Sequence, residues 1–207
     1  MVDLGLPSGT KWATCNLGAT SYKEIGGYYA WGETSPKTTF SWKNYKYSGN
    51  TSNSLTKYNT KSNYGKVDNK TQLEAADDKV KSDYGYYFSI PTKADWEELM
   101  KYCTWTRFGD GIRVMGIDEH HSIIYLPLNG YRDELNVYDE GKEGSYWSST
   151  LDAGSPDDAY YVRISNAKPT LDSYYRRQGR CIRPVQHKAE YAPPSTIQQA
   201  PALVNSK

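Results

Sequence analysis

The clearest hydrophobic periodicity in the chain lies in TKADWEELMKYC, residues 92–103. Its apolar positions recur at i, i+3, i+4 and i+7, the spacing of one helical face: Trp96, Leu99, Met100 and Cys103. Thr92 with Asp95 three positions later has the arrangement of a capping box, and Pro91 stands just before it. The pattern predicts a helix over 92–103 whose apolar stripe packs in the core.

Most other patterned segments are short and typical of β-strands. GIRVMGI and SIIYLPLNG flank the polar stretch DEHH, which indicates a hairpin connection. YWSST, AYYVRI and GRCIRPV follow, each bounded by Gly, Asp, Ser or Pro. Near the N-terminus we expect short strands broken by a Pro-Ser-Gly turn, one helical turn over 21–25, and a strand at YYAWGE, residues 28–33.

Two segments differ from this pattern. Residues 34–70 are rich in Lys, Thr, Ser, Asn and Tyr and poor in aliphatic residues, which predicts a long polar insertion rather than a second core. Residues 187–207 change abruptly to Ala, Pro and Gln, which predicts an extended arm that docks on a partner. The expected organisation is one domain over 1–186 followed by this tail.

The charge balance excludes several partners. The chain has 25 basic and 24 acidic residues, so it has no overall field that would hold a nucleic acid or an anionic membrane. No window approaches the ~18 apolar residues of a membrane-spanning helix. The N-terminus has neither the basic region nor the apolar stretch of a signal peptide, so we expect a chain that is not exported by one or has lost it.

Tyrosine is the unusual residue, with 20 copies against 3 phenylalanines. Tyr together with Ser, Gly and Asn makes an adaptable contact surface, because the ring supplies area at low entropy cost and the small residues supply hydrogen bonds. An aromatic-rich β protein with a hydrated core rim would have the same composition. Composition leaves both interpretations open.

Two serines in GSYWSST, Ser148 and Ser149, raise the question of nucleophilic catalysis. A serine nucleophile needs a strained elbow such as GxSxG and a histidine base. The elbow glycines are absent, and the only histidines are His120 and His121 in a polar turn and His187 in the tail. We expect no triad, and hydroxyls that bond to the backbone instead.

No metal or cofactor is expected either. His120 and His121 are adjacent, so on a strand they point to opposite faces. The acidic pairs 77–78 and 157–158 lack the DxDxDG pattern of a calcium loop, which favours turns and helix starts. The chain also lacks GxxxxGK[ST] and GxGxxG, so it has no loop that cradles phosphates.

The three cysteines are too few for a disulfide framework and lack the spacing of a zinc site. Cys15 and Cys103 are the pair most compatible with a single bond. The alternative is that all of them, with Cys181, are small buried hydrophobes.

The most distinctive chemical cluster lies late in the chain, where arginines alternate with tyrosines: Tyr174, Tyr175, Arg176, Arg177, Arg180 and Arg183. Arginine stacked on tyrosine suits the binding of anions, sugars or a protein surface. Charge pairing with nearby acidic loops is the structural alternative.

Seven phrases in order carry a resemblance to a known family: KWATCNLGAT, GGYYAWGE, FSIPTKADWEEL, YLPLNGYRD, GSYWSST, AYYVRI and GRCIRPV. Over roughly residues 2–185, the chain resembles the Fibrobacter succinogenes major paralogous domain and its relatives in Bacteroidetes and their phages. The resemblance implies an α+β domain with a C-type-lectin-like fold, two main helices and an irregular, mostly antiparallel sheet. Formylglycine-generating enzymes and the variable proteins of diversity-generating retroelements have similar folds.

The resemblance also implies where a ligand would bind. Trp147 would pack centrally, and the ligand face would be built by the residues around and after it. Carried over position by position, the candidate ligand-binding residues are Trp147, Asp157, Asp158, Tyr160, Tyr161, Arg163, Ser165, Asn166, Tyr174, Tyr175, Arg176, Arg177 and Arg180.

The sequence motifs of two activities known on this fold are absent from this chain. Formylglycine-generating enzymes use a C-x-x-x-x-C pair near the end of the domain, and Arg176 stands where the partner of Cys181 would be. The Glu-Pro-Asn, Gln-Pro-Asp and Trp-Asn-Asp motifs of calcium-dependent lectins are absent. We therefore expect a non-enzymatic recognition domain for a protein or glycan on a cell surface.

The expected setting is a phage virion, as a fibre, decoration or diversified receptor-binding protein, with the 187–207 tail docking on another virion subunit. A secreted or surface-anchored bacterial adhesin is the alternative, and an enzyme on a formylglycine-generating-enzyme-like fold is the second alternative.

Overall fold

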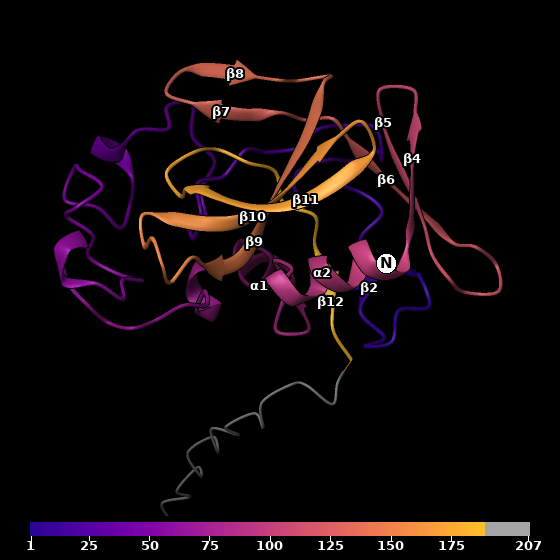
Figure 1. The fold of residues 1–207 in the computed structure, drawn as a ribbon, viewed down its shortest axis with the longest axis horizontal. Coiled ribbons are helices and arrows are strands. Elements are labelled where there is room, and N and C mark those ends of the chain that lie inside the picture. The colour runs from indigo at the N-terminus through magenta and orange to yellow at the C-terminus, as the bar shows by residue number, and fades with distance from the viewer. Residues whose placement is uncertain (189–207) are drawn as a thin grey trace, which may run out of the picture.

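A three-stranded antiparallel sheet forms the centre of the computed structural model, which describes residues 1–188 (Figure 1). Its strand order is β11–β10–β9, with bounds β9 Glu143–Leu151, β10 Asp158–Ser165 and β11 Lys168–Tyr175. Asn166 and Ala167 both have positive φ, at 51° and 59°, so β10 and β11 are joined by the tight two-residue turn that suits twisted strands.

The helix α2, Lys93–Tyr102, packs against one face of this sheet. Thr92 caps it and exchanges the expected hydrogen bonds with Asp95, so the predicted capping box is confirmed. Trp96 and Leu99 are fully buried. They belong to a hydrophobic cluster that includes residues from the helix-facing side of the sheet, namely Tyr146, Val162 and Ile164.

Three further sheets surround the centre. They are the antiparallel sheet of β4 Thr104–Phe108, β5 Gly111–Met115 and β6 Ile123–Pro127, the hairpin of β7 Tyr131–Asp133 and β8 Asn136–Tyr138, and a small sheet of β1 Val2–Asp3, β2 Lys11–Trp12, β12 Val185–Gln186 and β3 Phe88–Ser89. The DEHH stretch joins β5 to β6, which confirms the predicted hairpin. The expected α+β class, with few helices and mostly antiparallel strands, is confirmed for the described residues.

The remaining helical elements are short. The helix α1, Lys79–Tyr84, is capped by Asp78, so the acidic pair 77–78 marks a helix start as predicted. Three turns of 3-10 helix precede it: η1 Trp42–Asn44, η2 Ser62–Tyr64 and η3 Ala75–Asp77.

Residues 34–70 contribute to a second hydrophobic cluster, which their polar composition did not predict. The segment contains no strand, but four of its rings, those of Phe40, Tyr45, Tyr47 and Tyr58, are buried in a cluster with Trp31 and Trp147. The buried residues of the segment are Phe40, Tyr45, Tyr47, Leu55 and Tyr58. The burial was not expected from a segment poor in aliphatic residues. Tyrosine rings are buried there because their phenol hydroxyls find acceptors, as Tyr45 donates to the Trp31 carbonyl oxygen at 2.8 Å.

Three local predictions also need correction. Residues 28–33 are not a strand and pair only through an isolated bridge between Tyr29 and Arg180. The 21–25 segment is a turn closed by the Glu24 amide on the Ser21 carbonyl oxygen, not a helix. Cys15 and Cys103 do not pair, since all three cysteines are free.

Candidate functional site

The chain from 176 to 183 connects most parts of the described structure. Its backbone pairs with Tyr29 through Arg180, with Arg132 of β7 through Gly179, and with Trp147 of β9 through Cys181. The four arginines of this segment therefore emerge in different directions, and the sequence cluster is divided among different environments.

Two of these arginines are structural, contrary to the expectation that they bind a ligand. Arg176 is fully buried, and it donates to the carbonyl oxygens of Tyr58 at 2.6 Å and Lys57 at 2.8 Å. Arg177 donates to the Phe40 carbonyl oxygen at 2.7 Å and forms an ion pair with Asp133. Both guanidinium groups are already used, because they fasten the 34–70 segment and the β7–β8 hairpin to the C-terminal part of the fold.

Arg183 is also buried and saturated. It donates to Asn16 Oδ1 at 2.8 Å, to the Ala13 carbonyl oxygen at 2.9 Å and to the Tyr125 carbonyl oxygen at 2.7 Å. Burial lowers the pKa of Arg183, and these acceptors offset the cost of removing the cation from water.

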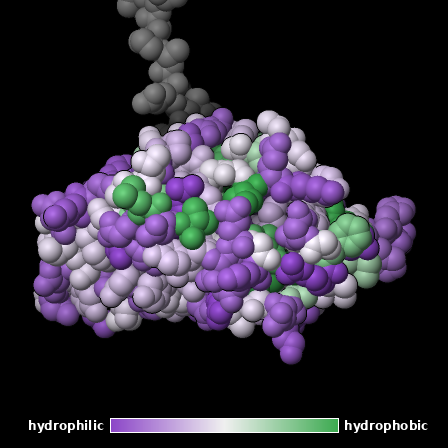
Figure 2. Space-filling view, turned by 90° about the horizontal axis from the view of Figure 1, so that it is seen from above, coloured by the Kyte–Doolittle hydropathy of each residue, from purple (hydrophilic) through white to green (hydrophobic). Residues whose placement is uncertain are grey.

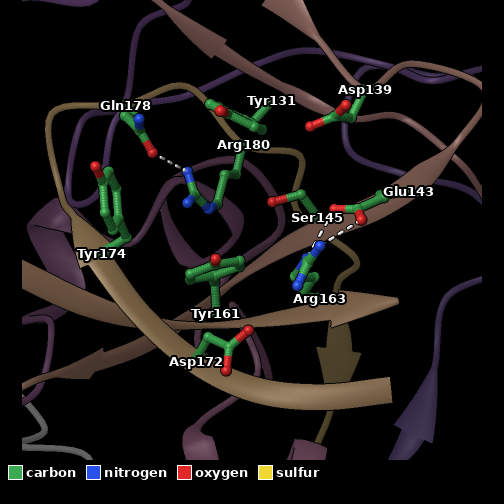
Figure 3. Close-up of a pocket in the computed structure, with 11 residues that line it drawn as sticks. Tyr131, Asp139, Glu143, Ser145, Tyr161, Arg163, Asp172, Tyr174, Gln178 and Arg180 are labelled. Carbon is green, nitrogen blue, oxygen red and sulfur yellow. Dashed lines mark hydrogen bonds and ion pairs between the residues drawn. The ribbon is translucent and has the colours of Figure 1, made fainter. Parts of the chain in front are cut away.

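Arg180 differs, because it lines a cavity of about 320 Å³. The cavity lies on the face of the central sheet opposite α2, and residues of the β7–β8 region border it (Figure 3). Its lining residues are Gly130, Tyr131, Asp139, Glu143, Ser145, Tyr161, Arg163, Asp172, Tyr174, Gln178 and Arg180. A cavity of this size lies at the lower end of the range for small-ligand sites.

Strand alternation and register place these side chains together. Tyr161 on β10 pairs with Trp147 on β9 and with Asp172 on β11, so the three project to the same face. Arg163 pairs in the same way with Ser145. Intervening residues, such as Val162, project to the α2 side.

Gly130 allows the hairpin to border the cavity. Its φ is +55°, and an added Cβ would collide with the Tyr138 carbonyl oxygen. Only glycine fits this conformation and this approach, so the residue before β7 is fixed by geometry.

The Arg180 guanidinium lies among aromatic rings. Its Cζ is 3.8 Å from the ring centre of Tyr161, 4.6 Å from that of Trp147 and 5.2 Å from that of Tyr131. Nη1 donates to Gln178 Oε1 at 2.7 Å, and Nε has no hydrogen-bond partner among the described residues, as is also true of Nε in Arg176 and Arg177. Unlike those two arginines, Arg180 has only this one acceptor. The residue is 2% exposed, and burial lowers its pKa. The rings supply cation–π attraction but leave hydrogen-bonding capacity unused.

The other charged groups of the cavity differ in whether they form ion pairs. Arg163 forms a two-point ion pair with Glu143, at 2.7 Å and 2.5 Å, and this hydrogen bonding lowers the pKa of Glu143. Asp139 and Asp172 form no ion pair with any described residue. The cavity therefore offers one buried cation and two carboxylates available to a ligand.

Four of the thirteen residues predicted from the family resemblance line this cavity: Tyr161, Arg163, Tyr174 and Arg180. Trp147 is 1% exposed and lies against the Arg180 guanidinium, so it supports the site and has no surface for a ligand. The central packing expected for Trp147 is confirmed.

The remaining predicted residues lie elsewhere. Besides Arg176 and Arg177, Tyr175 packs on Trp42, Tyr160 lies under Lys93, Ser165 and Asn166 form the end of the β10–β11 hairpin, and Asp157 and Asp158 stand at the start of β10.

Several lining residues were missed by sequence reasoning: Tyr131, Asp139, Glu143, Ser145, Asp172 and Gln178. Two of them, Glu143 and Ser145, had only the strand prediction for their segment as a signal, because residues two apart on a strand share a face. The β7–β8 residues had none, since nothing local indicates which sheet the hairpin covers.

Asp158 makes a testable contribution to stability outside the cavity. Burial, together with the carboxylates of Asp157 and Asp152, raises the pKa of Asp158 to about 7. An acid whose folded-state pKa exceeds its unfolded value of about 3.9 destabilises the fold once ionised, so its contribution is lost as the pH rises from about 4 through 7.

We therefore expect Asp158→Asn to raise the free energy of unfolding at pH 8 by about 2 kcal/mol and to change it little at pH 4. Urea titrations at both pH values measure this. Asp139→Asn removes the same charge from an exposed position and serves as the control. An equal effect of Asp158→Asn at the two pH values would contradict the assignment.

The side chains of Ser148 and Ser149 in GSYWSST bond to the backbone. Ser148 Oγ donates to the Tyr160 carbonyl oxygen at 2.8 Å, and Ser149 Oγ donates to the Pro91 carbonyl oxygen at 3.3 Å. Both are buried, and no described histidine contacts either one. The backbone-bonding role predicted for them is confirmed.

His187, the first residue of the predicted tail, contacts the domain. Its Nε2 lies 3.0 Å from Asp95 Oδ1 at the start of α2. The rest of the tail prediction concerns residues 189–207, which lie outside the described residues, so the docking role of that segment stays a prediction.

Within residues 1–188, no three side chains of His, Cys, Asp or Glu gather into a metal-binding group. No helix in the same range has both the length and the apolar character required to span a bilayer.

No protein-family model, no curated protein and no solved structure matches this chain. The comparisons therefore assign no family.

Proposed function

We propose that this protein is a non-enzymatic recognition domain that binds a protein or glycan ligand in the cavity over β9, β10 and β11. The observation that carries the proposal is the composition of that cavity. Three tyrosines, two arginines, a glutamine and three carboxylates converge there, while aliphatic side chains are absent from its lining. Rings and planar hydrogen-bonding groups suit reversible recognition of a polar surface.

The groups that covalent catalysis would need are unreactive. Cys181 is fully buried and burial raises the pKa of its thiol to about 12, so the thiolate nucleophile is scarce at neutral pH. The serines beside Trp147 are engaged with the backbone. These three residues lie outside the cavity lining, and their burial and hydrogen bonds argue against covalent catalysis by the cysteine and serines that the sequence singled out.

One face of the molecule is mostly polar. Figure 2 shows this face, which is dominated by hydrophilic and near-neutral residues and on which hydrophobic residues form only small patches. A large apolar patch would be expected for an obligate protein interface, whereas a polar face suits a soluble or surface-displayed ligand.

The fold we propose is the C-type-lectin-like fold of the Fibrobacter succinogenes major paralogous domain family, on the strength of the seven ordered phrases and the α+β architecture. In that family context, the setting we propose is a phage virion fibre, decoration or diversified receptor-binding protein. The adhesin of a bacterial surface would use the same cavity.

Alanine substitution at Tyr174 tests the proposed function. Tyr174 lines the cavity and is 46% exposed, so the change should remove contact area without unfolding the protein. On a glycan and protein array, we expect binding of the selected ligand to fall at least tenfold, which is about 1.4 kcal/mol.

Tyr86→Ala is the matched control, because Tyr86 is equally exposed at 46% and does not line the cavity. Equal affinities of the Tyr174 and Tyr86 variants would remove the cavity as the binding site. Arg177→Ala is unsuitable for this test, since its ion pair with Asp133 makes it structural.

A further inference from the structure

The starting observation is a buried cation without a counter-ion. Arg180 is one of four arginines in the 176–183 segment, and the guanidinium groups of the other three are each held by two or more oxygen acceptors. Arg180 has one, the amide oxygen of Gln178, and no described carboxylate forms an ion pair with it. A buried cation left in this state is costly unless a partner arrives.

Arg180 lines the cavity, and no hydrogen bond joins its Nη2 to any described residue. In Figure 3 the Arg180 side chain lies in the middle of the lining residues, with Gln178, Tyr131, Tyr174 and Tyr161 around it. The protein has already removed the guanidinium from bulk water, so an entering anion would gain charge-assisted hydrogen bonds at a dry site. A planar carboxylate fits the planar donor set of arginine.

The remaining charges restrict what else the ligand carries. Asp139 and Asp172 are not used in ion pairs among the described residues, whereas Glu143 is neutralised by Arg163. Ionised carboxylates only accept hydrogen bonds, so they suit hydroxyl donors and repel a second anionic group. The lining therefore suits a ligand that carries one anionic group and several hydroxyl groups.

The aromatic residues further define the ligand that would fit the cavity. Tyr174 is half exposed at the edge of the cavity and offers a ring face to an apolar patch of a flat ligand. No aliphatic side chain lines the cavity, so it has no pocket for the side chain of an apolar peptide residue.

We infer that the cavity binds a saccharide unit that carries a single carboxylate, as in a uronic acid, with the carboxylate on Arg180. Asp139 and Asp172 receive hydroxyl hydrogen bonds, and Tyr174 packs against the sugar ring. This inference rests on the proposed recognition function and names the class of its ligand. An acidic peptide is disfavoured because its further carboxylates would meet Asp139 and Asp172.

The test compares sugars that differ only at the acidic group. NMR titration of the full chain with methyl glucuronide and methyl galacturonide, each beside its neutral glucoside or galactoside, measures the selectivity for the carboxylate. We expect at least one acidic glycoside to bind at least tenfold more tightly than its neutral counterpart. Binding of neutral glycosides as tight as that of the acidic ones, or no binding of either acidic glycoside, would overturn the inference.

Two variants locate the selectivity. Arg180→Gln should abolish the preference for the acid, and Arg180→Lys should keep part of it, because lysine retains the charge without the planar pair of donors. Selectivity that persists in Arg180→Gln overturns the inference. Melting curves check that each variant folds, and the wild-type comparison stands even if one does not.

The outcomes separate the two proposals. Suppose that neutral sugars, or a peptide with a free C-terminal carboxylate, bind more tightly than the acidic sugars, and that Tyr174→Ala weakens this binding. That result would overturn the acidic-saccharide inference and leave the recognition function intact. An array ligand whose affinity is the same for Tyr174→Ala as for wild type would overturn the recognition function of this cavity.

Discussion

Arg176→Ala should lower the free energy of unfolding by about 4 kcal/mol, because it removes a buried side chain and leaves one buried and one partly buried carbonyl oxygen unpaired, at a cost of about 1–3 kcal/mol each. Those oxygens belong to Lys57 and Tyr58, which are 118 or more residues away in sequence. The guanidinium also packs against the rings of Trp31 and Tyr45. Urea denaturation followed by tryptophan fluorescence measures the loss.

Arg163→Ala is the control for this prediction. Arg163 has a side chain 47% exposed, and its ion pair with Glu143 lies at the surface, so its loss should cost about 1 kcal/mol or less. If the two alanine variants were equally stable, Arg176 would not be the link between the 34–70 segment and the C-terminal part of the fold.

Trp147→Ala should also cost about 4 kcal/mol, the range found when a large buried aromatic side chain is truncated. The indole is 1% exposed and its Nε1 donates to the Tyr29 carbonyl oxygen at 2.7 Å. Since Trp147 lies against Arg180 and Tyr161, the variant should also lose ligand binding at temperatures where it remains folded. Denaturation and binding titrations report the two effects separately.

Two further tryptophan variants sharpen the result. Trp147→Phe keeps most of the packing and loses the hydrogen bond, so it should cost about 1–2 kcal/mol. Trp42→Ala removes the same side chain from a partly exposed position on the 34–70 segment and should cost less than half as much as Trp147→Ala. If Trp42→Ala lowered the free energy of unfolding as much as Trp147→Ala, the burial of Trp147 would not explain its contribution to stability.

Local patterns determined much of the fold from sequence. The helix at 92–103 was predictable because its apolar spacing, its cap and its preceding proline all lie within one short window. The same holds for the hairpin around DEHH and for the strand character of GSYWSST. Each depends on neighbours a few residues apart, and local periodicity reports such contacts well.

The packing of residues 34–70 into the second hydrophobic cluster was not predictable in this way. Its aromatic residues carry no helical or strand period, and their partners lie far along the chain, as with Tyr58 and Arg176. Tyrosine abundance was correctly recognised as unusual, but composition alone does not divide the rings between a core and a binding face. In the structure, Tyr45 and Tyr58 lie in the core, whereas Tyr131 and Tyr174 line the cavity.

By itself, the sequence determined the capped helix and the strand character of several short segments, and the family resemblance implied the α+β class. Only the tertiary structure decided that Arg176, Arg177 and Arg183 hold the fold together, while Arg180 alone among these four lines the cavity. The physical reason is that a guanidinium is structural or free according to which acceptors surround it. Here those acceptors come from segments 44 to 170 residues away, whose positions no local pattern encodes.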